Sequence, residues 1–422
     1  MKIDDMILVS IDDHVIEPAD MFERHMPERY RAEAPKYVSG GPDGADHWEY
    51  QGVKTGAVGL NAVASWPHEE WGFDPVGHAE MRPGCYDMDQ RVRDMDANGV
   101  LASMCFPTMA GFNGMSLARS TVDRDLTKVV VSAYNDWHID ELAGEHPGRF
   151  LPLAILPVFD PEAMATEIAR VAAKGCHAVS LPEAPYGVGL PPYGDDYWAP
   201  VFTACQDHDV AVCLHIGGSF GLLQRPPDAS IDNLIILAPQ LSAVIVTDLI
   251  LAGLFVKYPR LKVAMSEGGI GWIPFYLDRL DRHVWNHRWT GLRIADEDIT
   301  PSELWRRNFL GCFITDPSSL RLRDRIGVDS IAWECDYPHS DSTWPRSPEL
   351  VLGELEGAGT SDEEIDKITW QNACRFFNFD PFRHRPREAA TVGALRAKAA
   401  DVDVSETSKA VYRERYYAGA SA

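Results

Sequence analysis

Eight near-continuous apolar runs are spread along the chain, and each is followed by a segment with helical periodicity. They begin near Ile7 and recur at 100–108, 150–157, 178–183, 210–218, 261–269, 308–316 and 330–341. Runs without polar alternation are typical of parallel strands that are covered on both faces. Eight strand–helix units predict an α/β fold, a closed (β/α)8 TIM barrel. A doubly wound open sheet is the alternative, but no GxGxxG or GxxxxGK(S/T) loop follows any run.

Two segments fall outside this repeat. Residues 37–86 are rich in Gly, Pro, Trp and His, and we interpret them as a loop excursion with a small hairpin around 47–54. Residues 386–422 are Ala-rich, charged and poor in large apolar side chains. We expect this tail to pack on the surface, to swap to a partner, or to fray. The predicted organisation is therefore a catalytic barrel domain over 1–385 and a tail over 386–422.

The charge balance limits the partners that the chain is expected to have. The 422 residues include 39 basic and 63 acidic side chains, a net charge of −24. This excess repels phosphate groups, so we expect neither nucleic acid nor an anionic membrane as a partner. No signal peptide and no apolar stretch of about 18 residues is apparent. Eight scattered cysteines without a CxxC motif predict reduced thiols and a cytoplasmic location.

Polar residues follow the apolar runs abruptly, where the functional groups of a barrel gather. Asp12 and His14 end the first run, and residues two apart on a strand point to the same side. A carboxylate and an imidazole held side by side can bind one metal ion, although a turn Asp and a plain loop His would look the same. The other strand-end candidates are Glu183, His215, Glu267, Asp316, Asp336 and His339.

Other interpretations of these residues remain open. Gly217, Ser219 and Gly221 match the GxSxG pattern of serine hydrolases, although a glycine-rich turn after His215 explains them as well. His283 and His287 have the i, i+4 spacing of a helical metal pair, but HExxH is absent. A metal-free barrel that serves as a binding or scaffold protein is the alternative without an enzyme activity.

The combination of motifs resembles the amidohydrolase superfamily. It is most similar to the amidohydrolase-related branch with aminocarboxymuconate semialdehyde decarboxylase and the resorcylate-type decarboxylases. The motifs that carry the resemblance are the Asp-x-His, CLHIGG, SEGGIGWIPF, DYPHSDSTWP and NACRFF. The resemblance implies a distorted (β/α)8 barrel and one divalent metal held by Asp12, His14, His215 and Asp336. The chain departs from the family in having Asp12 for a usual His or Glu, and Glu267 for the His of the decarboxylases.

Because of Glu267, our leading hypothesis is metal-dependent hydrolysis of a small amide, cyclic amide or related carbonyl compound by a metal-activated water. Asp336 would be both ligand and general base, and Glu267 would orient the nucleophile or carry a proton. Glu183, His339 and Trp344 are candidates for substrate binding. The alternative is nonoxidative decarboxylation of an aromatic or enoic acid. The expected metal is Zn²⁺, with Mn²⁺ or Fe²⁺ as alternatives, and the expected assembly is a homodimer.

Overall fold

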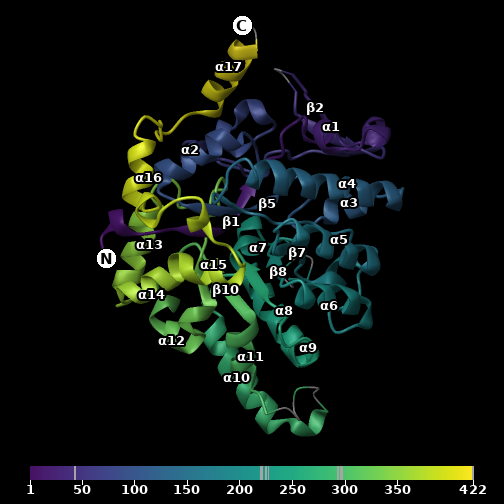
Figure 1. Ribbon diagram of the computed structural model, residues 1–422, viewed down its shortest axis with the longest axis vertical. Coiled ribbons are helices and arrows are strands. Elements are labelled where there is room, and N and C mark those ends of the chain that lie inside the picture. Colours follow the sequence, from purple (N-terminus) through teal and green to yellow (C-terminus); the bar gives the residue numbers. More distant parts are fainter. Residues whose placement is uncertain are drawn as a thin grey trace. The chain divides into compact units, whose positions relative to one another are not determined.

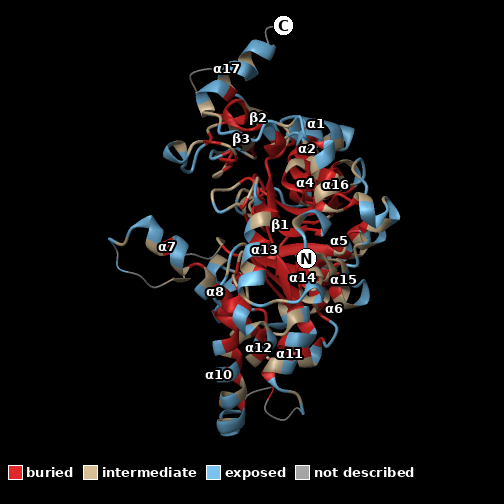
Figure 2. Cartoon of the chain, turned by 90° about the vertical axis from the view of Figure 1, so that its left-hand side faces the viewer, coloured by how far each residue is buried: buried red, intermediate tan, exposed pale blue. Residues whose placement is uncertain are grey.

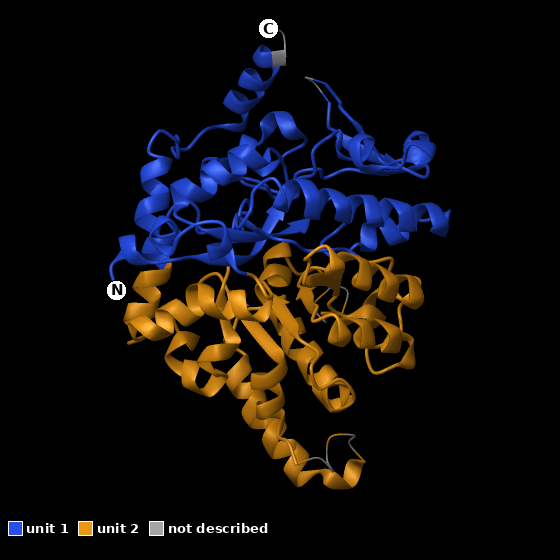
Figure 3. Ribbon diagram, in the orientation of Figure 1, with its two compact units in different colours: residues 1–155, 335–350, 380–422 blue, residues 156–334, 351–379 orange. Residues whose placement is uncertain are grey.

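The computed structural model describes residues 1–41, 44–218, 222–223, 226, 228–291, 294 and 298–420. The chain divides into two compact units (Figure 3). Unit 1 comprises residues 1–155, 335–350 and 380–422, and unit 2 comprises residues 156–334 and 351–379. Both units are discontinuous in sequence, so the chain leaves unit 1 and returns to it twice.

Unit 1 is built on a parallel sheet of three strands in the order β1–β5–β6 (Figure 1). The strands are β1 (Val9–Val15), β5 (Ala102–Pro107) and β6 (Phe150–Leu151). Every residue of these strands is buried, as the unalternating apolar runs predict. The third strand is shorter than its run, because Pro152 has no N–H to continue the ladder.

Unit 2 contains a parallel five-stranded sheet in the order β11–β10–β9–β8–β7. The strands are β7 (Ala178–Pro182), β8 (Ala211–His215), β9 (Val263–Ser266), β10 (Phe309–Phe313) and β11 (Ile331–Trp333). All their residues are also buried, and Figure 2 colours them red. Together the two sheets hold eight parallel strands, one in each predicted run, and spatial neighbours follow chain order.

Helices connect the strands. Those of unit 1 are α1 (Met21–His25), α2 (Met88–Asn98), α3 (Met115–Arg119), α4 (Arg124–Asp136), α16 (Val392–Lys398) and α17 (Lys409–Ala420). Those of unit 2 are α5 (Pro161–Ala173), α6 (Ala199–Asp207), α7 (Ile231–Leu237), α8 (Pro239–Leu251), α9 (Leu254–Lys257), α10 (Ile273–Asn286), α11 (Pro301–Asn308), α12 (Arg323–Ile326), α14 (Asp362–Asp366) and α15 (Asn372–Phe376). Helix α13 (Ser347–Gly357) begins in unit 1 and ends in unit 2.

Side-chain caps and glycines mark the ends of two of these helices. The side chain of Asp87 accepts a hydrogen bond from the Gln90 N–H at the start of α2, and Gly99 ends the helix with φ of 82°. Asp160 caps α5 in the same way, and the chain turns at Gly175 with φ of 88°. No single helix in the described ranges is long and apolar enough to cross a membrane, and α7 with α8 passes that test only as a bent pair.

The excursion and the tail both belong to unit 1. The predicted hairpin is present as β3 (His47–Tyr50) and β4 (Val53–Thr55), and β2 (Lys36–Val38) extends it to an antiparallel sheet of three strands. The tail forms α16 and α17 and packs on unit 1, so the first of the three expected behaviours is observed. All eight cysteines are free thiols, and seven are buried.

Candidate metal centre

The end of β1 presents its side chains in two opposite directions. The pairing of β1 with β5 shifts between Ser10 and Asp13, which is the signature of a β-bulge. Asp12 and His14 share one side, where the Asp12 Oδ1 lies 3.6 Å from the His14 Nε2. Asp13 points the other way, and its carboxyl accepts hydrogen bonds from the Tyr337 N–H at 3.0 Å and the Ser10 Oγ at 3.1 Å.

The segment that follows β11 is fixed to this strand end by its backbone. The Asp336 N–H donates to the Asp12 carbonyl at 2.7 Å, and the His14 N–H donates to the Tyr337 carbonyl at 2.7 Å. Asp336 adopts φ of 59°, in the left-handed region that residues other than glycine rarely occupy. This unusual conformation turns the Asp336 carboxylate toward His14.

Four side chains therefore converge in unit 1. The Asp336 Oδ1 lies 3.2 Å from the His14 Nε2 and 3.0 Å from the His339 Nδ1. The His14 and His339 rings stack with centroids 3.8 Å apart, and Phe112 lies 4.6 Å from the His14 ring. One ligand atom from each of His14, Asp336 and His339 lies within 4.8 Å of the others. Asp12, His14 and Asp336 are almost completely buried.

The electrostatics of this cluster suit a cation. Burial raises the pKa of Asp12 well above its usual range, and the nearby carboxylates of Asp336 and Asp13 add to the shift. Burial also acts on Asp336, but His339 and His14 outweigh it and hold the pKa of Asp336 well below its usual value. Two buried carboxylates thus face one imidazole nitrogen, and a divalent ion among these donors would relieve their repulsion. The residues present fit such an ion.

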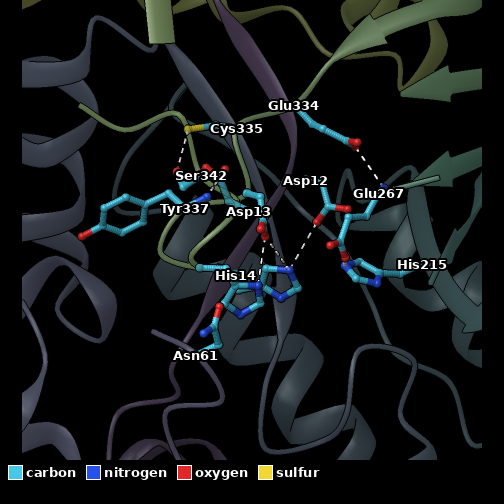
Figure 4. A network of polar contacts seen from close by, with 12 residues as sticks. Asp12, Asp13, His14, Asn61, His215, Glu267, Glu334, Cys335, Tyr337 and Ser342 are labelled. Carbon is cyan, nitrogen blue, oxygen red and sulfur yellow. Dashed lines mark hydrogen bonds and ion pairs between the residues drawn. The ribbon is translucent and has the colours of Figure 1, made fainter. Parts of the chain in front are cut away.

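A second group of strand-end residues lies in unit 2. The His215 Nδ1 donates to the Ile216 carbonyl at 2.5 Å, and the His215 Nε2 lies 3.5 Å from the Glu267 carboxylate. Glu267 has φ of 54°, and its N–H donates to the Glu334 carboxylate at 3.2 Å (Figure 4). Glu183 follows β7 directly and is 1% exposed.

Sequence reasoning missed three residues that support these groups: Asp13, Arg91 and Glu334. Arg91 is fully buried and donates to the His14 carbonyl at 2.5 Å and the Gly84 carbonyl at 2.6 Å. Its guanidinium also lies over the Tyr337 ring, 4.3 Å from the centroid. The Asp12–Asp13 doublet and the Glu334–Asp336 spacing were signals for Asp13 and Glu334. No signal in the sequence distinguishes Arg91 from the other charged residues of its helix.

The other predicted residues lie elsewhere. Trp344 packs under the Arg82 guanidinium at 4.7 Å and donates to the Asp94 carbonyl at 3.3 Å. These contacts give Trp344 a structural role. Its contact with a substrate stays a prediction. The rings of His283, in the last turn of α10, and His287, which caps that helix, stack with centroids 4.4 Å apart. Of the GxSxG residues, Ser219 and Gly221 lie outside the described residues.

Comparison with known proteins identifies relatives. The family model described as amidohydrolase matches residues 47–379, a stretch that begins after His14 and ends before the tail. A 2-amino-3-carboxymuconate-6-semialdehyde decarboxylase from Dictyostelium discoideum is 25% identical over 72% of this chain and 80% of its own length. A gamma-resorcylate decarboxylase from Polaromonas sp. is 27% identical over 74% of this chain and 92% of its own length.

Solved structures show the same architecture. An amidohydrolase from Mycobacterium avium subsp. paratuberculosis superposes with a TM-score of 0.67 at 21% identity, over 88% of this chain and 99% of that chain. A 5-carboxyvanillate decarboxylase from Novosphingobium aromaticivorans, complexed with manganese and 4-hydroxy-3-methoxy-5-nitrobenzoic acid, has a TM-score of 0.58 at 18% identity, over 89% and 97%. These likenesses confirm the predicted α/β fold of the distorted (β/α)8 barrel type.

Proposed function

Because the chain belongs to the amidohydrolase family, we propose that it is a metal-dependent, nonoxidative decarboxylase of a small aromatic or enoic acid. The observation that carries the proposal is the buried convergence of Asp12 and Asp336 on the His14 Nε2. The curated relatives are named as decarboxylases, which favours this reaction over the hydrolysis that we first expected.

The proposed ligands are Asp12, His14, His215 and Asp336. His215 ends β8, and functional groups of a (β/α)8 barrel gather at the carboxyl ends of its strands, which supports its inclusion among the proposed ligands. Mn²⁺ is our first choice of metal, since a solved neighbour contains manganese and oxygen-rich sites suit that ion. When bound, a divalent ion supplies positive charge that holds the substrate carboxylate and withdraws electrons from it.

The residues around the proposed ligands would bind the aromatic ring of the substrate and supply the proton that replaces its carboxylate. The imidazole of His339 and the ring of Phe112 offer flat surfaces beside His14 against which a substrate ring can stack. In the reaction the carbon that bears the carboxylate gains a proton, keeps the electron pair of the broken C–C bond, and releases CO₂. We assign delivery of this proton to Glu267, whose 24% exposed side chain can exchange protons with water. Glu183 is proposed to contact the substrate.

Hydrolysis of an amide stays the second candidate. It is favoured by Glu267, because the decarboxylases that this chain resembles have a histidine at that position. A carboxylate at this position suits the orientation of an attacking water. The location in the cytoplasm and the homodimer stay predictions.

The test is turnover of gamma-resorcylate and 5-carboxyvanillate by the Mn²⁺-loaded protein in D₂O. We expect CO₂ release and one deuterium on the carbon that lost the carboxylate. Asp336→Asn and His14→Ala should lose metal and at least about 10³-fold in rate, and Glu267→Gln should keep the metal and lose at least about 10²-fold.

The matched control is Asp209→Asn, which changes an exposed acid that precedes β8, whereas His215 ends that strand. Its rate should equal that of the unchanged protein. Hydrolysis of cyclic amides without CO₂ release from any aromatic acid would replace the proposal by the second candidate.

A further inference from the structure

The residues after Asp336 are held by a segment of the excursion that we call the wall segment, residues 57–66. The N–H groups of Val63 and Ala64 both donate to the Pro338 carbonyl, at 3.0 and 3.1 Å. The Asn61 Oδ1 accepts from the N–H and from the Oγ of Ser340, each at 2.8 Å. The wall segment thus holds the chain on both sides of His339, three residues beyond the proposed ligand Asp336.

The backbone of the wall segment is unusual in its own right. Four of its residues other than glycine have positive φ: Ala57 at 56°, Leu60 at 33°, Asn61 at 68° and Ser65 at 66°. Such conformations are sparsely populated and persist only where the surrounding structure imposes them. The wall segment therefore depends on contacts from outside itself.

The tail supplies those contacts. The Thr407 N–H donates to the Ser65 carbonyl at 2.7 Å, and the Tyr412 hydroxyl lies 2.7 Å from the Ser65 Oγ. The Tyr412 ring is 7% exposed and forms a buried cluster with Val63 and Trp66. The Tyr412 ring thus lies in one cluster with Val63, whose N–H donates to the Pro338 carbonyl.

A second set of bonds fastens the start of α17 beside this cluster. The Glu70 carboxylate accepts from the Ser408 Oγ at 2.7 Å and from the Lys409 N–H at 2.9 Å. The Arg413 guanidinium lies 3.2 Å from the carboxylate of Glu80, whose carbonyl accepts from the Trp66 indole. Tail and wall segment are therefore joined at several points and not through one side chain.

We propose that the tail is a positioning element of the metal centre, acting through the wall segment on the loop that carries Asp336 and His339. This inference rests on the proposed function, because it assumes that Asp336 is a metal ligand. Tyr412 is its central residue, since it contacts both Ser65 and Val63. The family-matched stretch ends at residue 379, so the tail lies outside it.

The test compares full-length variants by Mn²⁺ affinity, measured by competition with a chelator, and by hydrogen exchange without metal. Tyr412→Ala should weaken Mn²⁺ binding about fivefold or more, and amide exchange at Val63 and Ala64 should accelerate at least about tenfold. Tyr412→Phe keeps the packed ring and should recover most of the affinity. Asp401→Asn, an exposed change in the same tail, should alter neither quantity.

Should Tyr412→Ala not fold, the double variant Tyr412→Phe with Ser408→Ala keeps the ring and removes the hydroxyl bonds to Ser65 and Glu70, and it must weaken Mn²⁺ binding more than Tyr412→Phe alone does. Asp336→Asn tests the proposed metal centre separately from the proposed role of the tail. If Asp336→Asn loses Mn²⁺ while the Tyr412 variants bind it as the unchanged protein does, the tail has no positioning part. If Asp336→Asn also binds Mn²⁺ normally, the proposed metal centre itself is wrong.

Discussion

Two arginines on α2 show how much the environment of a residue decides its effect. Arg91 is fully buried and donates to the carbonyls of His14 and Gly84, and its charge lies near the buried Asp13 carboxyl. Arg93, two positions on, is 36% exposed and pairs with Asp401, which is 79% exposed. The amphipathic pattern of the helix does not distinguish the two residues, so only the structure reveals the support for His14.

We predict that Arg91→Met lowers the free energy of unfolding by about 3 to 5 kcal/mol, because it leaves a buried carboxyl without its cation and two carbonyls without donors. Arg93→Met is the matched control and should change stability by less than about 1 kcal/mol, because the lost pair is exposed. Urea unfolding of both variants measures the difference. Equal losses would mean that Arg91 does not compensate Asp13.

Glu17 gives a pH dependence that can be tested. It accepts the N–H groups of Thr108 and Met109 at 3.0 and 2.9 Å, but burial dominates and raises its pKa from 4.5 to about 7. The folded protein then holds this proton more tightly than the unfolded chain. The stability from this group is full below pH 4.5 and is lost as the pH rises to about 7.

Glu17→Gln should remove this slope. Relative to the variant, we expect the unchanged protein to lose about 3 kcal/mol of unfolding free energy between pH 4.5 and 8. Chemical unfolding across that range is the measurement. Parallel curves for the two proteins would show that folding leaves the pKa of Glu17 at its ordinary value.

At the scale of elements, the eight strands could be predicted from the sequence because each lies in a continuous apolar run, and most of these runs end at a polar residue. The β-bulge in β1 could not, because it depends on pairing with β5 and leaves no mark in Val9–Val15 itself. The left-handed φ of Asp336 and Glu267 escaped prediction for a similar reason. Non-glycine residues adopt it only under the constraint of distant contacts.

Asn372 at the start of α15 secures β11, the strand that leads to Asp336. Its Nδ2 donates to the carbonyls of Val328 and Ile331, both at 2.8 Å, and the residue is fully buried. Asn372→Ala should cost about 2 kcal/mol, because two buried carbonyls lose their donor. The neighbouring Gln371→Ala, at a half-buried position, should cost less than about 1 kcal/mol in the same thermal or urea experiment.

At the scale of the molecule, the barrel followed from counting strand–helix units, and the comparisons confirm it. The docking of the tail could not be read from its composition, because polar bonds to Ser65 and Glu70 hold it as much as apolar contact does. Low apolar content left packing, swapping and fraying all open, because it says nothing about hydrogen-bond partners some 340 residues away.

Metal binding should be visible as global stability. At a free Mn²⁺ concentration of about 100 times the dissociation constant, the free energy of unfolding should rise by about 2.7 kcal/mol, because only the folded chain assembles the ligands. Asp336→Asn should show no such gain. A gain of equal size in that variant would place the ion elsewhere in the protein.

The discontinuous course of unit 1 has a consequence for biosynthesis. At about 5 to 20 residues per second, a ribosome needs some tens of seconds after making Asp12 before Asp336 leaves it, and longer before the last helix appears. During that interval the nascent chain displays an acid and an imidazole without their partners. With the proposed ligand set, full coordination of an ion waits until Asp336 has been made, so acquisition of the metal follows the synthesis of the last ligand.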